Sequence, residues 1–215
     1  MKKHVLIFGG GSFLSKAFNE KYGAHFTITN IYRDDQHGLK GFDFEIDNPE
    51  TFSATLDDYQ AVLFFQGINP STGVNEMTAD HFIKMFNINI VTPALLIKKL
   101  EGKLAKGALV LFVSSVATKK GSYDPAYASA KSGLQGLMHS LANAWSDLRF
   151  NIISLGLVEG SPVYEQMTAD FRQKHASRMF NNSFIKVDDV VRVVAELINN
   201  HSINRTNIEI DGGYH

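Results

Sequence analysis

The sequence predicts an α/β domain in which a doubly wound parallel sheet of about seven strands carries helices on both faces. Short apolar runs alternate with longer segments of helical period along the whole 215-residue chain, and such β-α alternation is typical of parallel sheets. Several of the apolar runs lack polar alternation, as strands covered on both faces do. No repeat, low-complexity tract or linker divides the chain, so residues 1–215 are expected to form a single domain.

The predicted strands are rich in Val, Ile, Leu and Phe. They lie at Val5–Phe8, Phe26–Ile31, Ala61–Phe65, Leu109–Val113, Asn151–Leu155 and Ile208–Ile210, with Phe42–Ile46 as a weaker candidate. The predicted helices lie at Phe13–Tyr22, Thr51–Leu56, Ala79–Leu100, Tyr127–Leu148 and Val187–Asn199. Glu159–Phe184 is the least regular stretch, and a mobile substrate lid would lie in such a late connection. A solvated surface helix is the alternative for that stretch.

The composition excludes several classes of protein. Lys and Arg number 21 against 22 Asp and Glu, a balance that argues against nucleic-acid binding or membrane attachment through bulk charge. The chain has no cysteine, and its histidines show no metal-binding spacing, so no metal site is expected. No apolar run approaches the ~18 residues that a membrane-spanning helix needs. We therefore expect a cytoplasmic protein.

A glycine-rich turn, Gly9-Gly10-Gly11-Ser12, joins the first predicted strand to the first predicted helix. Glycines allow a sharp turn and a close approach of the backbone to a ligand, and the helix start supplies unpaired N–H groups. This position predicts a pyrophosphate site of a dinucleotide, with Gly9, Gly11 and Ser12 around it. A tight connection without a ligand is the alternative, because G-x-G-x-x-G and G-K-[ST] are both absent.

The end of the second predicted strand should meet the adenosine ribose of such a dinucleotide. An arginine there favours the 2′-phosphate of NADP, whereas an acidic residue favours the free 2′-hydroxyl of NAD. Arg33 comes first and Asp34-Asp35 follow. The sequence therefore favours NADP(H) over NAD(H) through Arg33, with a solvated strand end as the alternative.

Tyr127 and Lys131 are four residues apart on one predicted helix, so their side chains share a face. A phenol titrates near ~10, too high for acid–base catalysis at neutral pH. An ammonium ~5 Å away in a partly buried cleft would supply roughly 3 kcal/mol toward lowering that pKa. A solvent-facing polar pair is the alternative. Upstream, Ser114-Ser115 end a predicted strand, where a serine can donate a hydrogen bond to a substrate oxygen.

Ser115 and Tyr127-x-x-x-Lys131, on a chain opened by a glycine turn, resemble the short-chain dehydrogenase/reductase family over essentially the whole sequence. The closing Asp211-Gly212-Gly213 is similar to the end of that family's last strand. The resemblance implies a Rossmann-type fold in which Tyr127 is the general acid or base. Lys131 would lower the pKa of Tyr127 and bind the nicotinamide ribose. Ser115, with Ser114 as the alternative, would polarise the substrate oxygen.

The resemblance also implies a role for Asn89, which would anchor a proton relay beyond Lys131. The cofactor-binding residues that it implies are Gly9, Gly11, Ser12, Phe13, Leu14, Arg33, Glu45, Ile46, Gln66, Gly67, Tyr127, Lys131, Gly156 and Val158. Among these, Glu45-Ile46 stand where the family has an acidic and apolar pair beside the adenine.

The glycine motif departs from the family pattern. Phe13 and Ser15 occupy two positions that the family usually fills with glycine, and Gln66-Gly67 and Leu155-Gly156 depart from two further motifs. Phe13 is compatible with the cofactor if its ring packs away from the pyrophosphate. The departures bear on cofactor affinity and choice more than on the type of reaction.

The resemblance implies an oxidoreductase that transfers a hydride between NADP(H), or NAD(H), and a carbonyl/alcohol pair. It also implies a homodimer or homotetramer built partly on the helix Tyr127–Leu148. A non-catalytic nucleotide-sensing module with a degraded glycine motif is the main alternative. An epimerase or dehydratase with a retained NAD is another, although relatives that act on sugar nucleotides carry a larger substrate domain.

Overall fold

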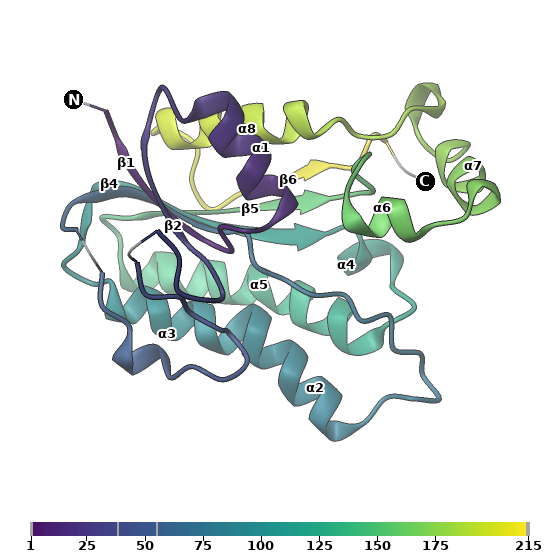
Figure 1. Cartoon of the computed structure of the whole chain (residues 1–215), viewed down its shortest axis with the longest axis horizontal. Helices are drawn as coiled ribbons and strands as arrows, with labels where there is room; N and C mark the ends of the chain where they lie inside the picture. The colour runs from purple at the N-terminus through teal and green to yellow at the C-terminus, as the bar shows by residue number, and fades with distance from the viewer. Residues whose placement is uncertain (1, 38, 55, 214–215) are drawn as a thin grey trace.

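The computed structural model describes residues 2–37, 39–54 and 56–213, and it contains a six-stranded parallel sheet in the order β2-β1-β3-β4-β5-β6. The predicted α/β class with helices on both faces is confirmed (Figure 1). The strands are β1 His4–Phe8, β2 Thr27–Ile31, β3 Tyr59–Phe64, β4 Leu104–Ser115, β5 Arg149–Leu155 and β6 Asn207–Ile210. The strand order reverses between β1 and β3, and ligands of open α/β sheets bind at such a switch point.

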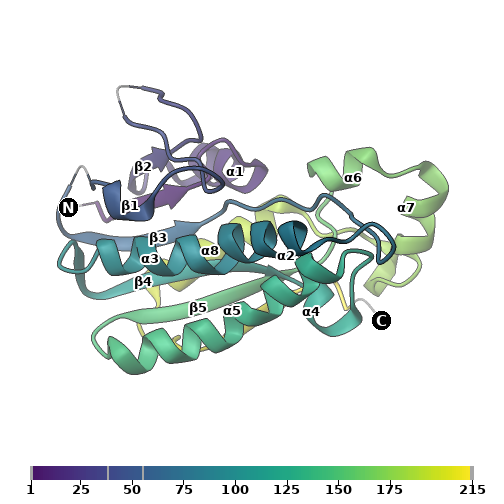
Figure 2. The ribbon, with the colours of Figure 1, turned by 90° about the horizontal axis from the view of Figure 1, so that it is seen from below.

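Helices cover both faces of the sheet, as Figure 2 shows from below. The first face carries α1 Phe13–Tyr22 and α8 Val187–Asn199. The second carries α2 Ala79–Phe86, α3 Thr92–Lys99 and α5 Pro125–Ala144. Short helices α4 Ala117–Lys120, α6 Pro162–Gln166 and α7 Ala169–Ala176 lie near the carboxyl ends of β4 and β5 (Figure 1). None of the helices within the described ranges has the length and apolar character to cross a membrane.

The weaker strand candidate Phe42–Ile46 forms a turn and not a strand. The Asp43 carboxylate accepts a hydrogen bond from the Glu45 N–H at 2.8 Å, which satisfies locally an amide that a strand would pair across a sheet. Phe42 and Phe44 are buried against Phe8 of β1, with ring centroids 6.4 and 5.8 Å away. The apolar alternation therefore anchors a loop to the core.

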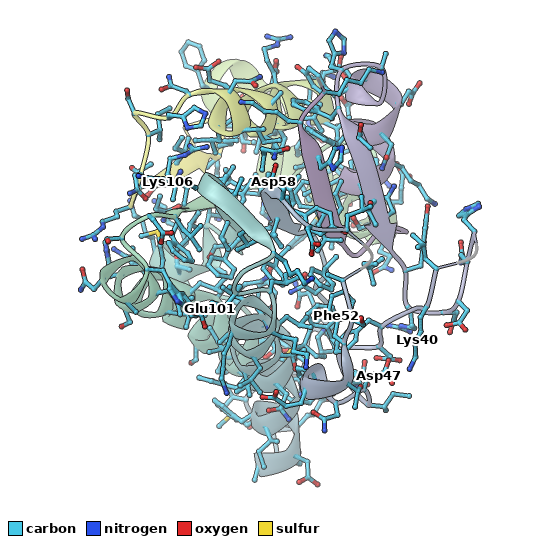
Figure 3. The ribbon with its side chains drawn as sticks, turned by 90° about the vertical axis from the view of Figure 1, so that its left-hand side faces the viewer. Lys40, Asp47, Phe52, Asp58, Glu101 and Lys106 are labelled. Carbon is cyan, nitrogen blue, oxygen red and sulfur yellow. The ribbon has the colours of Figure 1, made fainter. Side chains whose placement is uncertain are left out.

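Two helix predictions also need correction. The described part of Thr51–Leu56 holds only the end of a 3-10 turn at Pro49–Thr51, and residue 55 lies outside the described residues. Phe52 points into the aromatic cluster, while Lys40 and Asp47 lie on the outer loop (Figure 3). Figure 3 also shows Asp58 and Lys106 at the starts of β3 and β4, at the end of the sheet opposite the glycine turn.

The predicted helix Ala79–Leu100 is interrupted by a π-helical turn at Asn87–Val91 between α2 and α3. Such a turn inserts one residue into the hydrogen-bond ladder and re-aims the side chains on it. The predicted helix Tyr127–Leu148 begins two residues earlier, at Pro125, and ends at Ala144. Asp124 caps it by accepting the Tyr127 N–H, and Pro125 occupies the first helical position, which fixes where the helix starts.

Candidate active site

A continuous cleft runs along the carboxyl edge of the sheet. A cavity of about 330 Å³ extends from Arg33 past the glycine turn to Gln66, and a cavity of about 800 Å³ contains Ser115 and Tyr127. The two share Ser12, Glu45, Phe65, Gly67 and Ile68 in their walls. Residues following β1, β3, β4 and β5 thus meet at one edge, as parallel strands require.

The glycine turn is shaped by its neighbours. Gly9 has φ +84°, and a Cβ there would lie 2.6 Å from the Gln66 amide nitrogen, so only glycine fits. The Ser12 hydroxyl accepts the Ser15 N–H and caps α1. Among the described residues, the N–H groups of Gly11, Phe13 and Leu14 have no protein partner. Free amides at a helix start form a cradle for an anion, and this one fits a pyrophosphate.

The two residues that replace glycines are accommodated in different ways. The Phe13 ring extends toward the segment after β5, where its Cζ lies 3.7 Å from where a Gly160 Cβ would be. The ring therefore packs away from the free amides of the turn. Ser15 is fully buried, and its hydroxyl donates to the Asn30 carboxamide oxygen at 2.9 Å. Asn19 completes this polar cluster with hydrogen bonds to both Ser15 and Asn30.

Arg33 lines the narrower cavity with its side chain 64% exposed, and its Nε lies 3.7 Å from an Asp43 carboxylate oxygen. Glu45 lines both cavities and forms a 2.8 Å ion pair with Lys84 of α2. Ile46, the other half of the predicted adenine-binding pair, is 81% exposed and lies outside both cavity walls.

Gln66 and Gly67 follow β3 and lie between the turn and the catalytic helix. The Gln66 side-chain oxygen is buried without a hydrogen-bond partner among the described residues. A Cβ at Gly67 would lie 3.5 Å from the Lys131 ammonium nitrogen, so Gly67 lies between the cavity wall that it lines and the buried Lys131. On the other side, Gly156 and Val158 follow β5 in the wall of the larger cavity.

Tyr127, Lys131 and Ser115 come together where α5 crosses the end of β4. The Lys131 nitrogen lies 5.9 Å from the Tyr127 ring centroid and donates to the Val113 carbonyl oxygen at 2.8 Å. The Ser115 oxygen accepts the Ala117 N–H, which leaves its hydroxyl proton free to bond to the Tyr127 oxygen. Ser114 is buried and donates to the Lys131 carbonyl oxygen, so it has a structural partner already.

Asn89 lies in the π-helical turn behind Lys131. Its side-chain nitrogen donates to the Met85 carbonyl oxygen at 2.8 Å, while its side-chain oxygen is buried without a partner in the described part of the chain. That oxygen lies 4.0 Å from the position of a Gly67 Cβ. A buried unpaired acceptor is costly, and here it faces the region next to the Lys131 ammonium.

The electrostatics of the pair differ from the sequence-based expectation. Burial raises the pKa of Tyr127, the negative charge of Asp124 raises that pKa further, and the hydrogen bond from Ser115 lowers it in part. Burial also lowers the pKa of Lys131 to about 8. In the protein alone the pKa of Tyr127 is therefore raised and not lowered, because the burial that brings the two groups together disfavours the charge on each.

Three features that position the site escaped the sequence analysis. His81 of α2 lies 2.9 Å from the carboxylate of Asp124, which is fully buried at the start of α5. The Glu45–Lys84 ion pair joins the loop after β2 to α2. The cap at Asp124 could have been found, since Asp-Pro directly before an apolar helix is a start signal. The two pairings could not, because their partners are far apart in sequence.

Segment Glu159–Phe184 contains α6, α7 and a 3-10 turn at Phe180–Asn182. Its first helix gives Pro162, Val163 and Gln166 to the wall of the larger cavity. The Arg172 guanidinium lies 4.3 Å from the Tyr164 ring centroid and donates to the Tyr164 carbonyl oxygen, which joins α7 to α6. Within the described ranges, no group of His, Cys, Asp and Glu side chains could hold a metal ion.

Residues 50–215 match the family model described as enoyl-(acyl carrier protein) reductase, one of the short-chain dehydrogenase/reductase models. The chain belongs to the short-chain dehydrogenase/reductase family. It is therefore a short-chain dehydrogenase/reductase enzyme, and its class of chemistry is oxidation and reduction. No curated protein sequence matches it.

Several solved structures share the fold over nearly the whole chain. A small-chain dehydrogenase in complex with NADPH is 20% identical, with a TM-score of 0.85 and coverage of 99% of this chain and 98% of that one. The TT0495 protein from Thermus thermophilus is also 20% identical, with a TM-score of 0.86 and the same coverages of 99% and 98%. A 4-hydroxyisoleucine dehydrogenase complexed with NADH is 21% identical, with a TM-score of 0.80 and coverages of 99% and 98%.

The buried ammonium predicts a stability that depends on pH. Because folding lowers the pKa of Lys131 from 10.5 to about 8, its buried charge costs stability below pH ~8, and that cost falls as pH rises toward ~10.5. Lys131→Met should therefore raise the free energy of unfolding at pH 7 by about 2 kcal/mol, after loss of the hydrogen bond to Val113. Urea unfolding at pH 7 and 9.5 should show this gain shrinking at the higher pH.

The exposed Lys16→Met on α1 is the control, with an expected change within about 0.5 kcal/mol at both pH values. A Lys131→Met protein less stable than the wild type at pH 7 would contradict this account of the site.

Proposed function

We propose that this short-chain dehydrogenase/reductase transfers a hydride between NADP(H) and the carbon of a carbonyl/alcohol pair, with Tyr127 as general acid or base. The observation that carries the proposal is the convergence of the Ser115 and Tyr127 hydroxyls in the larger cavity, with Lys131 behind them. Two neighbouring hydroxyl groups in one cavity wall suit a single substrate oxygen. A nucleotide sensor has no chemical need for this arrangement.

The cleft fits a nicotinamide dinucleotide. The free amides of Gly11, Phe13 and Leu14 would hold the pyrophosphate, and the unpaired Gln66 oxygen offers an acceptor beside it. Lys131, reached past Gly67, would bond to the nicotinamide ribose, while Gly156 and Val158 would form the wall behind the ring. When bound, the cofactor supplies or accepts the hydride.

The chain's own residues would handle the proton and the orientation of the substrate. Ser115 would hold the carbonyl oxygen by a hydrogen bond, and Tyr127 would give that oxygen its phenolic proton during reduction. Lys131 would stabilise the resulting phenolate and return a proton to it. The unpaired oxygen of Asn89 would accept a hydrogen bond from a water that links Lys131 to solvent.

The preference for NADP(H) rests on Arg33. Its guanidinium is exposed in the wall of the narrower cavity, where the 2′-phosphate of an adenosine ribose would lie. Asp43 and Glu45 share that wall, but each already has a cationic neighbour, Arg33 and Lys84 respectively. The pairing reduces their repulsion of a phosphate.

The substrate is proposed to be neutral and largely apolar. Apart from the catalytic hydroxyls and the Glu45–Lys84 ion pair, the described wall of the larger cavity consists of apolar residues and uncharged polar ones. They include Ile68, Asn69, Pro70, Val116, Leu157, Ser161, Pro162, Val163 and Gln166. The cation in that cavity wall, Lys84, is paired with Glu45, so a substrate carboxylate would find no free positive partner there.

Tyr127→Phe should lower kcat by about 10²–10⁴-fold, because only the proton donor is lost. NADPH affinity, measured by fluorescence titration, should change by less than about threefold.

Turnover of the wild-type protein and of the variants is measured with a panel of neutral ketones and aldehydes and with keto acids. The wild-type protein is expected to turn over the neutral compounds. Tyr123→Phe is the matched control, since Tyr123 is 71% exposed and lies outside the cavity walls. Unchanged turnover in Tyr127→Phe would remove that residue from the mechanism.

Arg33→Ala should weaken NADPH binding about tenfold relative to NADH, because it removes the cation proposed to meet the 2′-phosphate. Fluorescence titration of both cofactors gives the ratio, with Arg192→Ala on α8 as the exposed control. An unchanged ratio would show that Arg33 does not read the 2′-phosphate.

A homodimer or homotetramer is proposed to form partly through α5. The small residues Ser132, Gly136, Ser140 and Ala144 recur every four positions along α5 and are exposed, so another helix could approach closely there. Sedimentation should give a species of at least twice 23.9 kDa. Ser140→Arg, placed within the stripe, should shift it toward the monomer, and a wild-type protein that sediments as a monomer would contradict the proposal.

A further inference from the structure

Asp124 is a buried carboxylate that the proposed reaction does not use. It is fully buried, three residues before Tyr127, and accepts the Tyr127 N–H at 3.0 Å and the Thr72 N–H at 3.2 Å. The His81 ring nitrogen Nε2 lies 2.9 and 3.0 Å from its two oxygens. The His81 side chain is only 11% exposed. Each oxygen of the carboxylate thus has a partner that is fixed in the fold.

These contacts join three segments around the site. Thr72 follows Ile68, Asn69 and Pro70, which line the larger cavity. His81 lies in α2, which runs on into the π-helical turn that carries Asn89. Asp124 itself caps the helix that carries Tyr127. A shift of this carboxylate would therefore move the phenol relative to both the substrate wall and the Asn89 turn.

The carboxylate also acts on the phenol through its charge. Burial alone would raise the pKa of Asp124, but hydrogen bonds from the Tyr127 N–H, His81 and the Thr72 N–H outweigh burial and lower that pKa. Asp124 is therefore an anion at neutral pH, and its charge raises the pKa of Tyr127. A hydrogen bond donated by His81 stabilises the Asp124 anion and so weakens its effect on the Tyr127 phenol.

The other charged groups around the Tyr127 phenol either take part in the proposed reaction or are already paired with each other. Lys131 reaches it from the same helix, and β4 contributes the uncharged Ser115. Lys84 of α2 and Glu45 of the loop after β2 line the same cavity as an ion pair of no net charge. Asp124 is thus the uncompensated anion nearest to Tyr127 in the described chain, and His81 is its side-chain hydrogen-bond partner.

We propose that Asp124 and His81 are positioning residues for Tyr127, which set both the placement of the phenol and how readily it releases its proton. The proposal rests on the proposed function, in which Tyr127 is the acid or base. Asp124 supplies the helix cap and the negative charge. His81 supplies the hydrogen-bond donor that keeps the carboxylate in place.

The test measures the ionisation of Tyr127 directly, in protein without cofactor or substrate. Tyrosines are replaced biosynthetically by a fluorinated tyrosine, which titrates at lower pH, and the fluorine resonances are followed by NMR. The resonance missing from Tyr127→Phe identifies residue 127. Because no turnover is involved, this reading stands whether or not the proposed reaction is correct.

Three variants should give three different results. Asp124→Asn keeps a capping oxygen but removes the charge, so residue 127 should ionise about half a pH unit lower. His81→Phe removes the hydrogen-bond donor to the Asp124 carboxylate, so its negative charge acts more strongly on the phenol. Residue 127 should therefore ionise at higher pH. His81→Gln keeps a donor near the same place and should restore a titration close to that of the wild type.

Activity supplies the second reading. His81→Phe should lower kcat at least fivefold with KM changed less than twofold, and His81→Gln should recover most of that loss. If Asp124→Asn does not fold, the two His81 variants still decide the question, because they leave the cap intact. Titrations of residue 127 identical in folded Asp124→Asn or His81→Phe and in the wild type would overturn the proposal, as would equal defects in His81→Phe and His81→Gln.

Discussion

The hydrogen bond from the Lys131 ammonium to the Val113 carbonyl oxygen joins the catalytic helix to the sheet, and the arrangement of the site depends on it. At 2.8 Å it fixes α5 against the end of β4, where Ser115 follows two residues later. The Ser114 hydroxyl adds a second link by donating to the Lys131 carbonyl oxygen. Burial of the ammonium costs stability even with this hydrogen bond in place. The contact fixes the position of a group that burial disfavours.

Two side-chain pairs around the site each join different segments. Glu45 meets Lys84 across from the glycine turn, and the carboxylate of Asp124 meets His81 at the start of α5. Lys131 differs from these pairs because its buried ammonium donates to a backbone carbonyl oxygen and not to a carboxylate. Its charge thus remains available to a phenolate that forms during reaction, which is the state in which an ammonium next to Tyr127 has the largest effect.

The fold could be predicted because parallel strands covered on both faces leave unbroken apolar runs, and α1 and α8 lie at the predicted Phe13–Tyr22 and Val187–Asn199. The extra strand at Phe42–Ile46 could not be excluded from the sequence, since alternating aromatics look the same in a strand and in a loop packed on a core. The π-helical turn at Asn87–Val91 leaves the spacing of apolar residues consistent with one continuous helix, so the sequence does not show where the helix is interrupted. Local spacing therefore predicted the elements but not the irregular backbone that aims Asn89.

The same division holds for the site. Tyr127 and Lys131 are one helical turn apart, so spacing alone placed them on a common face. The strand end indicated both Ser114 and Ser115, and the choice of Ser115 rested on the family resemblance. The accommodation of Phe13 and Ser15 depends on Gly160 and Asn30, which lie outside the glycine motif. The direction of the Tyr127 pKa was mispredicted because the extent of burial is set by packing of the whole edge of the sheet.

A crystal structure of the wild-type protein with NADP⁺ and an alcohol substrate analogue tests the central claim most directly. The account predicts the pyrophosphate on the amides of Gly11, Phe13 and Leu14, and the analogue oxygen within hydrogen-bond distance of both the Ser115 and Tyr127 hydroxyls. A nucleotide bound elsewhere, or an analogue whose oxygen touches neither hydroxyl, would contradict it.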